Sequence, residues 1–176
     1  MKKIALIGLV LALAVLAGGC GTTRYDVKPE MKSEILLAKQ TKEVALTLKY
    51  YQPSIIRPLI TREENSNPDT EQIDAGTKFL NLVKEELRNK GFIINSNAAI
   101  SIEIGFAYRK GTLFITNGSI ATRWKGFYKN NPLFEISDFK LLGPIFGGGG
   151  VTEEKGKQLA QHIVEDFNNE LEKIEK

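Results

Sequence analysis

The chain has 176 residues, of which 42% are apolar and 26% are charged, and its formal net charge is +3. This composition is typical of an ordinary globular domain, and the length favours one domain over two. Because the net charge is small and Lys and Arg form no run, a nucleic-acid-binding protein is not expected. The single Cys and the single His exclude a disulfide scaffold and do not supply the four ligands of a structural zinc site.

Residues 1–19 have the features of a secretory signal peptide. A basic start at residues 1–3 is followed by an uncharged apolar run over residues 4–17 and by two glycines before Cys20. The apolar run is about 14 residues long, which is short of the roughly 20 that a helix needs to cross a bilayer. Residues 16–20, Leu-Ala-Gly-Gly-Cys, resemble the lipobox of bacterial lipoproteins, although a strict lipobox has Leu where this chain has Ala17.

The lipobox resemblance implies a lipid on Cys20. It implies cleavage before Cys20, diacylglycerol on the sulfur and acylation of the new amine. Gly21 and Thr22 after the Cys, rather than an Asp, imply by analogy the outer membrane, with the periplasmic or surface side left open. The alternative is that Cys20 is a buried residue or a free thiol behind an uncleaved anchor.

Residues 20–42 are predicted to be a lipidated N-terminus and tether. They hold few aromatic residues, mixed charge and Pro29, with room for a short helix over residues 33–40. The folded domain is therefore predicted to span residues 43–176.

Alternating apolar residues predict the strands of this domain. The predicted strands cover residues 43–50, 92–94, 100–108, 120–128 and 133–140, with residues 113–115 as an extension of one hairpin. Three prolines and a polar run make residues 53–68 a predicted long loop.

Apolar residues at steps of three and four predict two amphipathic helices. The first is capped by Asp69 or Thr70, ends at residues 89–91 and has an apolar stripe of Ile73, Gly76, Leu80, Val83 and Leu87. The second is capped by Thr152 and has a stripe of Ala160, Ile163, Phe167, Leu171 and Ile174. The order of elements predicts an α+β fold, an antiparallel sheet of four to five strands with both helices on one face.

No catalytic residue, metal or cofactor is expected. His162 lies off the apolar stripe of the last helix, and Cys20 is assigned to lipid, so no nucleophile stands beside a base. Adjacent carboxylates, as at residues 153–154, are typical of a solvated helix surface. The glycine run at residues 147–150 does not match a phosphate loop, because Gln158 follows Gly156-Lys157 where Ser or Thr is needed.

Seven residues are candidates for contact with a partner. Basic and aromatic side chains combine in the first group, and an apolar lip beside the glycine run forms the second: Arg109, Lys110, Arg123, Trp124 and Tyr128, then Ile145 and Phe146. The first group fits a glycan or protein surface, but strand alternation also explains it as one buried and one wet face. The lip fits contact with a membrane or partner, and a flexible connection to the last helix explains it as well.

Residues 43–53, Glu-Val-Ala-Leu-Thr-Leu-Lys-Tyr-Tyr-Gln-Pro, resemble the first strand of the neuraminyllactose-binding haemagglutinin (HpaA-like) lipoproteins. The helix end at residues 86–92, Glu-Leu-Arg-Asn-Lys-Gly-Phe, is similar to that family and to YajG-like outer-membrane lipoproteins. The resemblance implies a surface or periplasm-facing lipoprotein of α+β fold, associated in the first family with adhesion. This chain is shorter and has only Arg109-Lys110 in place of a Lys/Arg-rich stretch, so no sugar-binding residue is carried over.

The predicted function is that of a non-enzymatic, lipid-anchored envelope protein that binds a protein or glycan partner, and the resemblance implies an adhesin-like role. The alternative is a periplasm-facing accessory or structural subunit of an envelope transport, secretion or flagellar assembly. The identity of the partner and the oligomeric state are left open.

Overall fold

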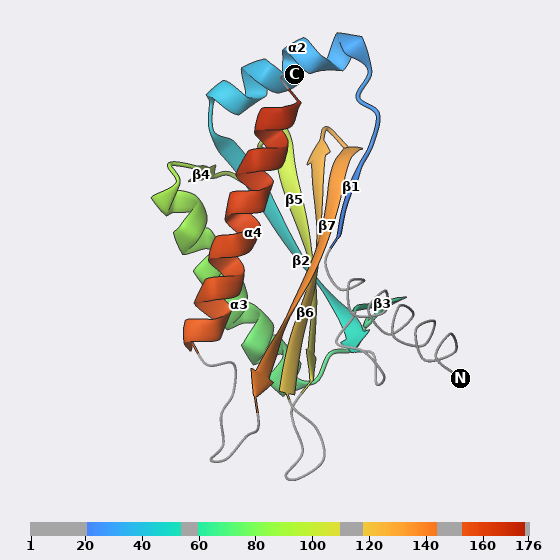
Figure 1. The fold of residues 1–176 in the computed structure, drawn as a ribbon, viewed down its shortest axis with the longest axis vertical. Helices are drawn as coiled ribbons and strands as arrows, with labels where there is room; N and C mark the ends of the chain where they lie inside the picture. Colours follow the sequence, from blue (N-terminus) through green and yellow to red (C-terminus); the bar gives the residue numbers. More distant parts are fainter. Residues whose placement is uncertain (1–20, 54–59, 110–117, 144–152, 175–176) are drawn as a thin grey trace, which may run out of the picture.

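The computed structural model describes residues 21–53, 60–109, 118–143 and 153–174 (Figure 1). The described residues form an α+β fold, which confirms the predicted class. Its helices are α2 (Pro29–Gln40), α3 (Thr70–Asn89) and α4 (Glu153–Lys173). Its strands are β1 (Gly21–Arg24), β2 (Glu43–Pro53), β3 (Ile60–Glu64), β4 (Ile93–Ile94), β5 (Ile100–Arg109), β6 (Gly118–Tyr128) and β7 (Asn131–Gly143).

The strands form one mixed sheet in the order β1-β7-β6-β5-β2-β3, with β4 also paired to β2. Strands β5, β6 and β7 make the expected antiparallel meander. Strand β2 is parallel to β5, with Leu46 opposite Ile102, because α3 carries the chain back along the sheet before β5 begins. The prediction of four to five antiparallel strands was therefore wrong in number and in direction.

Two of the seven strands, β1 and β3, were not predicted and account for the difference in number. Strand β4 is the short strand expected at residues 92–94, reduced to two residues. Strand β3 lies inside the predicted loop and pairs with the end of β2, where Glu64 is opposite Tyr51 and a bulge intervenes. The middle of that loop, residues 54–59, lies outside the described residues.

Helices α3 and α4 lie side by side over one face of the sheet, and α2 crosses one end of it (Figure 1). The Asp69 side chain caps α3 by accepting a hydrogen bond from the Gln72 amide at 2.7 Å, as predicted. Gly76, Val83 and Leu87 of the predicted stripe of α3 are buried, whereas Ile73 is 42% exposed. Ala75 and Phe79, which the prediction left out, are buried as well. The stripe of α4 is confirmed from Ala160 to Leu171, and Thr152 lies outside the described residues.

The segment predicted to be a tether belongs to the fold. Strand β1 pairs with β7 from Gly21, opposite Ser137, to Arg24, opposite Phe134. Helix α2 follows, and its Ile35 is 1% exposed in the same core as the other two helices. Pro29 stands in the first turn of α2, where a missing N–H removes no hydrogen bond, so it marks a helix start.

The first 20 residues, with the predicted signal peptide and Cys20, lie outside the described residues. Among the helices that the structure describes, none combines the length and apolar character needed to span a bilayer.

Candidate functional site

The structure separates the basic and aromatic residues that the sequence places together on β6. Trp124 is 1% exposed and Tyr128 is 4% exposed, and both lie in the core under the helices. Arg123 points to the other, helix-free face, because successive side chains of a strand alternate. The alternation predicted for this strand is confirmed, and Trp124 and Tyr128 are corrected from candidate contact residues to core residues.

The remaining candidate contact residues are Arg109, Lys110, Ile145 and Phe146. Arg109 is half-buried at the end of β5. Lys110, Ile145 and Phe146 lie outside the described residues, so the proposed lip stays a prediction. His162 lies exposed on α4, 3.7 Å from the Asp166 carboxylate one turn later, which agrees with its predicted place off the stripe.

The helix-free face carries a network of charges around Glu135 of β7. Arg123 Nε lies 3.2 Å and Lys125 Nζ 3.8 Å from the Glu135 carboxylate, and the Tyr25 hydroxyl donates to it at 3.2 Å. The Arg123 guanidinium also lies 5.7 Å from the centre of the Tyr51 ring. Partial burial, followed by the Glu135 charge, raises the pKa of Tyr25, so its hydroxyl remains a hydrogen-bond donor.

A second group of charged side chains on the helix-free face also forms ion pairs. Lys49 Nζ lies 3.1 Å from Glu103 and 3.7 Å from Glu64, and the hydrogen bond to Glu103 is the main reason why the pKa of Lys49 is raised. The charged side chains of this face thus find partners within the sheet itself.

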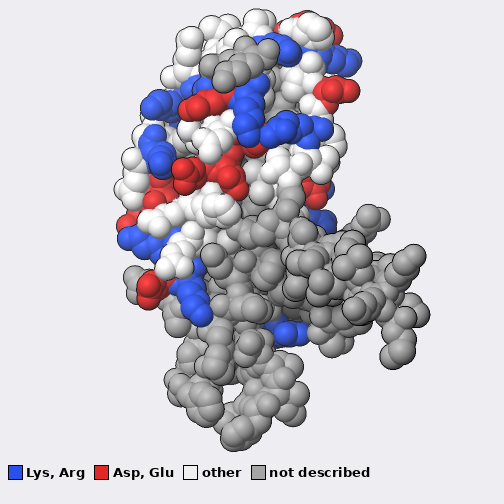
Figure 2. Space-filling model, in the orientation of Figure 1, with Lys and Arg blue, Asp and Glu red and all other residues white. Residues whose placement is uncertain are grey.

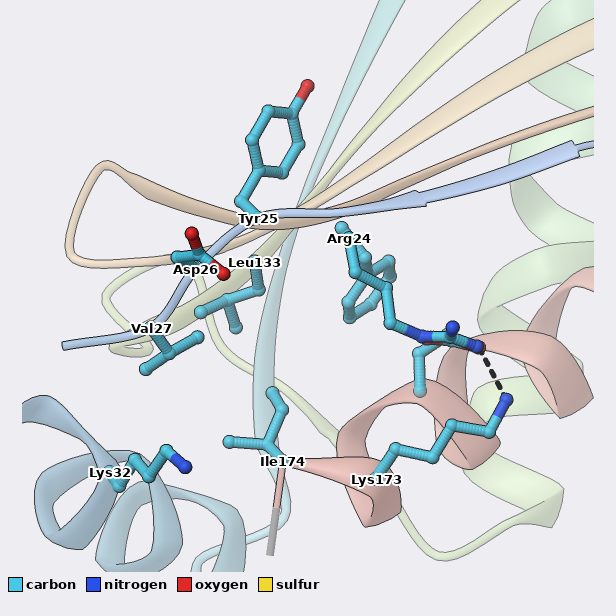
Figure 3. A pocket seen from close by; sticks show the side chains of 10 residues that line it. Arg24, Tyr25, Asp26, Val27, Lys32, Leu133, Lys173 and Ile174 are labelled. Atoms are coloured by element: carbon cyan, nitrogen blue, oxygen red, sulfur yellow. Dashed lines mark hydrogen bonds and ion pairs between the residues drawn. The ribbon is translucent and has the colours of Figure 1, made fainter. Parts of the chain in front are cut away.

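A cavity of about 300 Å³ lies where β1 leads into α2, against the start of β7 and the end of α4 (Figure 3). Its lining combines apolar side chains with three cationic and two acidic ones. The lining residues are Arg24, Tyr25, Asp26, Val27, Lys32, Leu133, Phe134, Glu170, Lys173 and Ile174. A second hollow of about 260 Å³ shares Tyr25, Asp26, Val27 and Leu133 with it and continues over Lys28 and Met31 of α2.

One carboxylate organises the cationic side of this cavity. Glu170 of α4 is 5% exposed and accepts hydrogen bonds from Arg24 Nε at 2.5 Å, Arg24 Nη2 at 2.9 Å and Lys173 Nζ at 2.7 Å. The hydrogen bond from Arg24 is the main cause that lowers the pKa of Glu170 and outweighs its burial. Glu170 therefore stays ionised and joins β1 to α4.

The third cation of the cavity, Lys32, comes from α2. Figure 3 shows Lys32 of α2 and Lys173 of α4 on either side of Ile174. Because Lys32 has no ion-pair partner among the described residues, its charge is available to an anionic group in the cavity. An apolar floor with such a rim suits an acidic side chain of a partner or a small anionic amphiphile.

The cavity lining contains no His, Cys or Ser, and no cluster of metal-ligating side chains occurs among the described residues. Basic and acidic side chains are intermixed over the described part of the face on which α4 lies (Figure 2).

Sequence reasoning missed this cavity because it assigned the whole of residues 20–42 to a tether. A signal was present in residues 22–27, Thr-Thr-Arg-Tyr-Asp-Val, in which β-branched and aromatic residues are typical of a strand. Glu170 gave no such signal, since its partner Arg24 is 146 residues away.

No family model matches the chain, and no curated protein matches its sequence. Among solved structures, the chain is similar to the PelC dodecamer from Paraburkholderia phytofirmans, with 12% identity, a TM-score of 0.49 and coverage of 84% of this chain and 96% of that chain. A point variant of the same dodecamer gives 12% identity, a TM-score of 0.47 and coverage of 88% and 98%. An uncharacterized protein gives 15% identity, a TM-score of 0.36 and coverage of 75% and 88%.

Proposed function

We propose that the chain is a non-enzymatic lipoprotein of the outer membrane, anchored through Cys20, whose domain binds a protein or glycan partner. The observation that carries the anchor is the N-terminal sequence, a basic start and an apolar run ending in small residues before the only Cys. Each buried methylene of an acyl chain contributes about 0.8 kcal/mol, so two or three chains hold a domain at a membrane without a spanning helix.

The cavity beside Arg24 supports the binding part of the proposal. It offers Lys32 and an apolar floor to a ligand, while the ion pair between the exposed Arg24 and the buried Glu170 joins β1 to α4 at its wall. A partner that presents a carboxylate next to an apolar group, as an acidic peptide or an acidic sugar does, fits this lining.

Metabolic labelling with a palmitate analogue tests the anchor. We expect label on the wild-type chain, no label on Cys20→Ala, and full label on Thr23→Ala, which changes an exposed residue of β1 close to the modified site. An unlabelled wild-type chain, or a labelled Cys20→Ala variant, would refute the lipoprotein assignment.

Crosslinking in intact envelopes, followed by purification of this chain, tests the partner. We expect Lys32→Glu to reduce recovery of the crosslinked species, because it reverses the charge at the cavity rim. Lys78→Glu makes the same change on the exposed side of α3 and should leave recovery unchanged. Equal recovery of the crosslinked species from Lys32→Glu and Lys78→Glu would show that the cavity is not part of the binding site.

Protease treatment of intact cells distinguishes the two sides of the membrane. Cleavage of the domain would agree with a surface protein of the adhesin type. Protection from protease, together with copurification of a stable envelope complex, would instead favour the accessory subunit of a transport, secretion or flagellar assembly.

A further inference from the structure

The fold begins immediately after the proposed lipid-bearing residue. Strand β1 starts at Gly21, which is joined to Cys20 by a single peptide bond and lies opposite Ser137 in the ladder with β7. Consecutive Cα atoms are about 3.8 Å apart, so a lipid on Cys20 would be attached one residue before the first paired residue of β1. No linker residues separate the lipid from the domain.

Several independent contacts keep this N-terminal segment on the domain. Beyond the β1 ladder, the Tyr25 amide donates to the Leu133 carbonyl at 3.0 Å. Arg24 is ion-paired with the buried Glu170 of α4. Such a combination of ladder and ion pair makes β1 an integral strand, so the lipid cannot move far from the sheet while the protein is folded.

Contacts of helix α2 hold the C-terminal part of this segment on the domain. Its Ile35 is in the core, and Glu34 accepts hydrogen bonds from the Tyr128 hydroxyl at 2.7 Å and from Lys129 Nζ at 2.9 Å. The segment from Gly21 to Gln40 is thus held at both ends and in its middle.

Strand β1 is also the edge of the sheet, since only β7 pairs with it among the described strands. Its side chains Thr22 and Thr23 are exposed and uncharged. Small neutral hydroxyl side chains suit the hydrated headgroup region of a bilayer. A second copy of the chain is a weaker fit for this edge, because a four-residue strand offers little area compared with the roughly 800 Å² per partner of a stable interface.

On the basis of the proposed lipidation of Cys20, we infer that the β1 edge lies directly against the bilayer and that the domain is held there in one orientation. Four strand spacings separate β1 from β2, which places β2 about 19 Å further from the membrane at about 4.8 Å per spacing. Helix α4 contacts β7 and lies on the membrane side, whereas α3 contacts β5, β4 and β2 and lies on the far side (Figure 1).

Fluorescence quenching in vesicles tests this orientation. The full-length lipidated protein is reconstituted into phospholipid vesicles that contain a lipid with a quencher at its headgroup. Once Cys20 is consumed by lipid, a Cys introduced at another position is the only free thiol, because the natural chain has one Cys. Thr23→Cys in β1 and Asn89→Cys at the end of α3 replace exposed polar residues and accept the same fluorophore.

We expect the fluorophore at position 23 to be quenched several-fold more strongly than the one at position 89. An insertion of about twelve Gly and Ser residues between Cys20 and Gly21 spans roughly 19 Å and should abolish the difference, since the domain then tumbles freely. Circular dichroism of each variant verifies that it is folded.

The possible results test the orientation of the domain separately from the lipid anchor on Cys20. Flotation of the wild-type protein with the vesicles together with equal quenching at both positions would overturn the orientation alone. Equal, weak quenching with two chains per particle in detergent would assign the β1 edge to a second copy instead. A wild-type protein that does not float, like Cys20→Ser, would overturn the anchor and the orientation with it.

Discussion

Gly126 of β6 is a position where only a missing side chain allows the core to pack. A Cβ at this position would overlap the end of the Phe134 ring on the neighbouring strand β7. Phe134 is 2% exposed, and its ring centre lies 5.8 Å from that of Phe167 on α4, so the ring has little room to turn away. The glycine therefore sets the distance between the sheet and α4.

Gly126→Ala is expected to lower the free energy of unfolding by about 1–3 kcal/mol, the range for overpacking in a core. Denaturant unfolding measures this through the fluorescence of Trp124, the only Trp of the chain. In a Phe134→Leu background the cost of the same substitution should be smaller, because the ring is gone. An equal cost in both backgrounds would show that the overlap with Phe134 is not the cause.

Glu170 predicts how stability depends on pH. Because Arg24 and Lys173 lower its pKa in the folded state, the folded protein binds fewer protons here than the unfolded chain. Its stabilising effect is therefore fully present above the unfolded pKa, near 4.5, and is lost as the pH falls through the lower folded value.

We expect the free energy of unfolding to decrease as the pH is lowered below about 4.5, and to decrease less steeply in Glu170→Gln, which cannot ionise. Urea unfolding at a series of pH values between neutrality and acid makes the comparison. Asp26→Asn, which removes a nearby carboxylate from the same cavity without such an ion pair, is the control. Identical slopes for wild type and Glu170→Gln would contradict a lowered pKa.

Among the elements, α2 departs most from its prediction. Its apolar residues Met31, Ile35 and Ala38 recur at steps of four and three, but Leu36 and Leu37 lie outside this spacing. The single buried side chain, Ile35, instead fills a position between elements that come from distant parts of the chain. Met31 and Ala38 are partly buried against the same core, so α2 contributes a short stripe of three residues that the prediction of a tether did not use.

Ile35→Ala is expected to lower the free energy of unfolding by about 2–5 kcal/mol, as the loss of a fully buried aliphatic side chain does. Leu37→Ala is the matched control, because Leu37 lies two residues away on the same helix and is 65% exposed. Its effect should be within about 0.5 kcal/mol. If residues 20–42 were a tether, both substitutions would be silent in denaturant unfolding.

For the whole molecule, the structure moves the beginning of the domain from Glu43 to Gly21. The fragment 21–176 is expected to unfold cooperatively, because it retains the β1 ladder, the Arg24 ion pair and Ile35. The fragment 43–176 loses all three and exposes the edge of β7. Thermal unfolding followed by circular dichroism should give a lower midpoint for the shorter fragment. Equal midpoints would show that residues 21–42 are a tether and do not stabilise the domain.

The new boundary also changes the function expected of the N-terminus. A tether would let the domain reach partners at a distance from the membrane and in any orientation. With the proposed lipid on Cys20, a strand that starts at Gly21 would hold the domain next to the bilayer, and the cavity beside Arg24 would lie between the anchored edge and α2. Partner binding at this cavity would occur close to the membrane surface.

The sequence alone determined the features that depend on short-range periodicity and on local chemistry. The strands β2, β5 and β6, the caps of α3 and the apolar stripe of α4 were predicted because their patterns recur every two, three or four residues. The predicted lipid site at Cys20 also rests on five consecutive residues.

Only the tertiary structure decided which strands are parallel, where the domain begins and which charges meet. The pairing of Arg24 with Glu170 and the place of β1 beside β7 each join residues that are more than 90 positions apart, and Ile35 is buried in a core that includes residues of β5, β6 and α4. A pattern along the chain carries no information about such contacts, because they depend on how α3 and α4 bring the sheet and the C-terminus together. For that reason the cavity and the oriented edge came from the structure and not from the sequence.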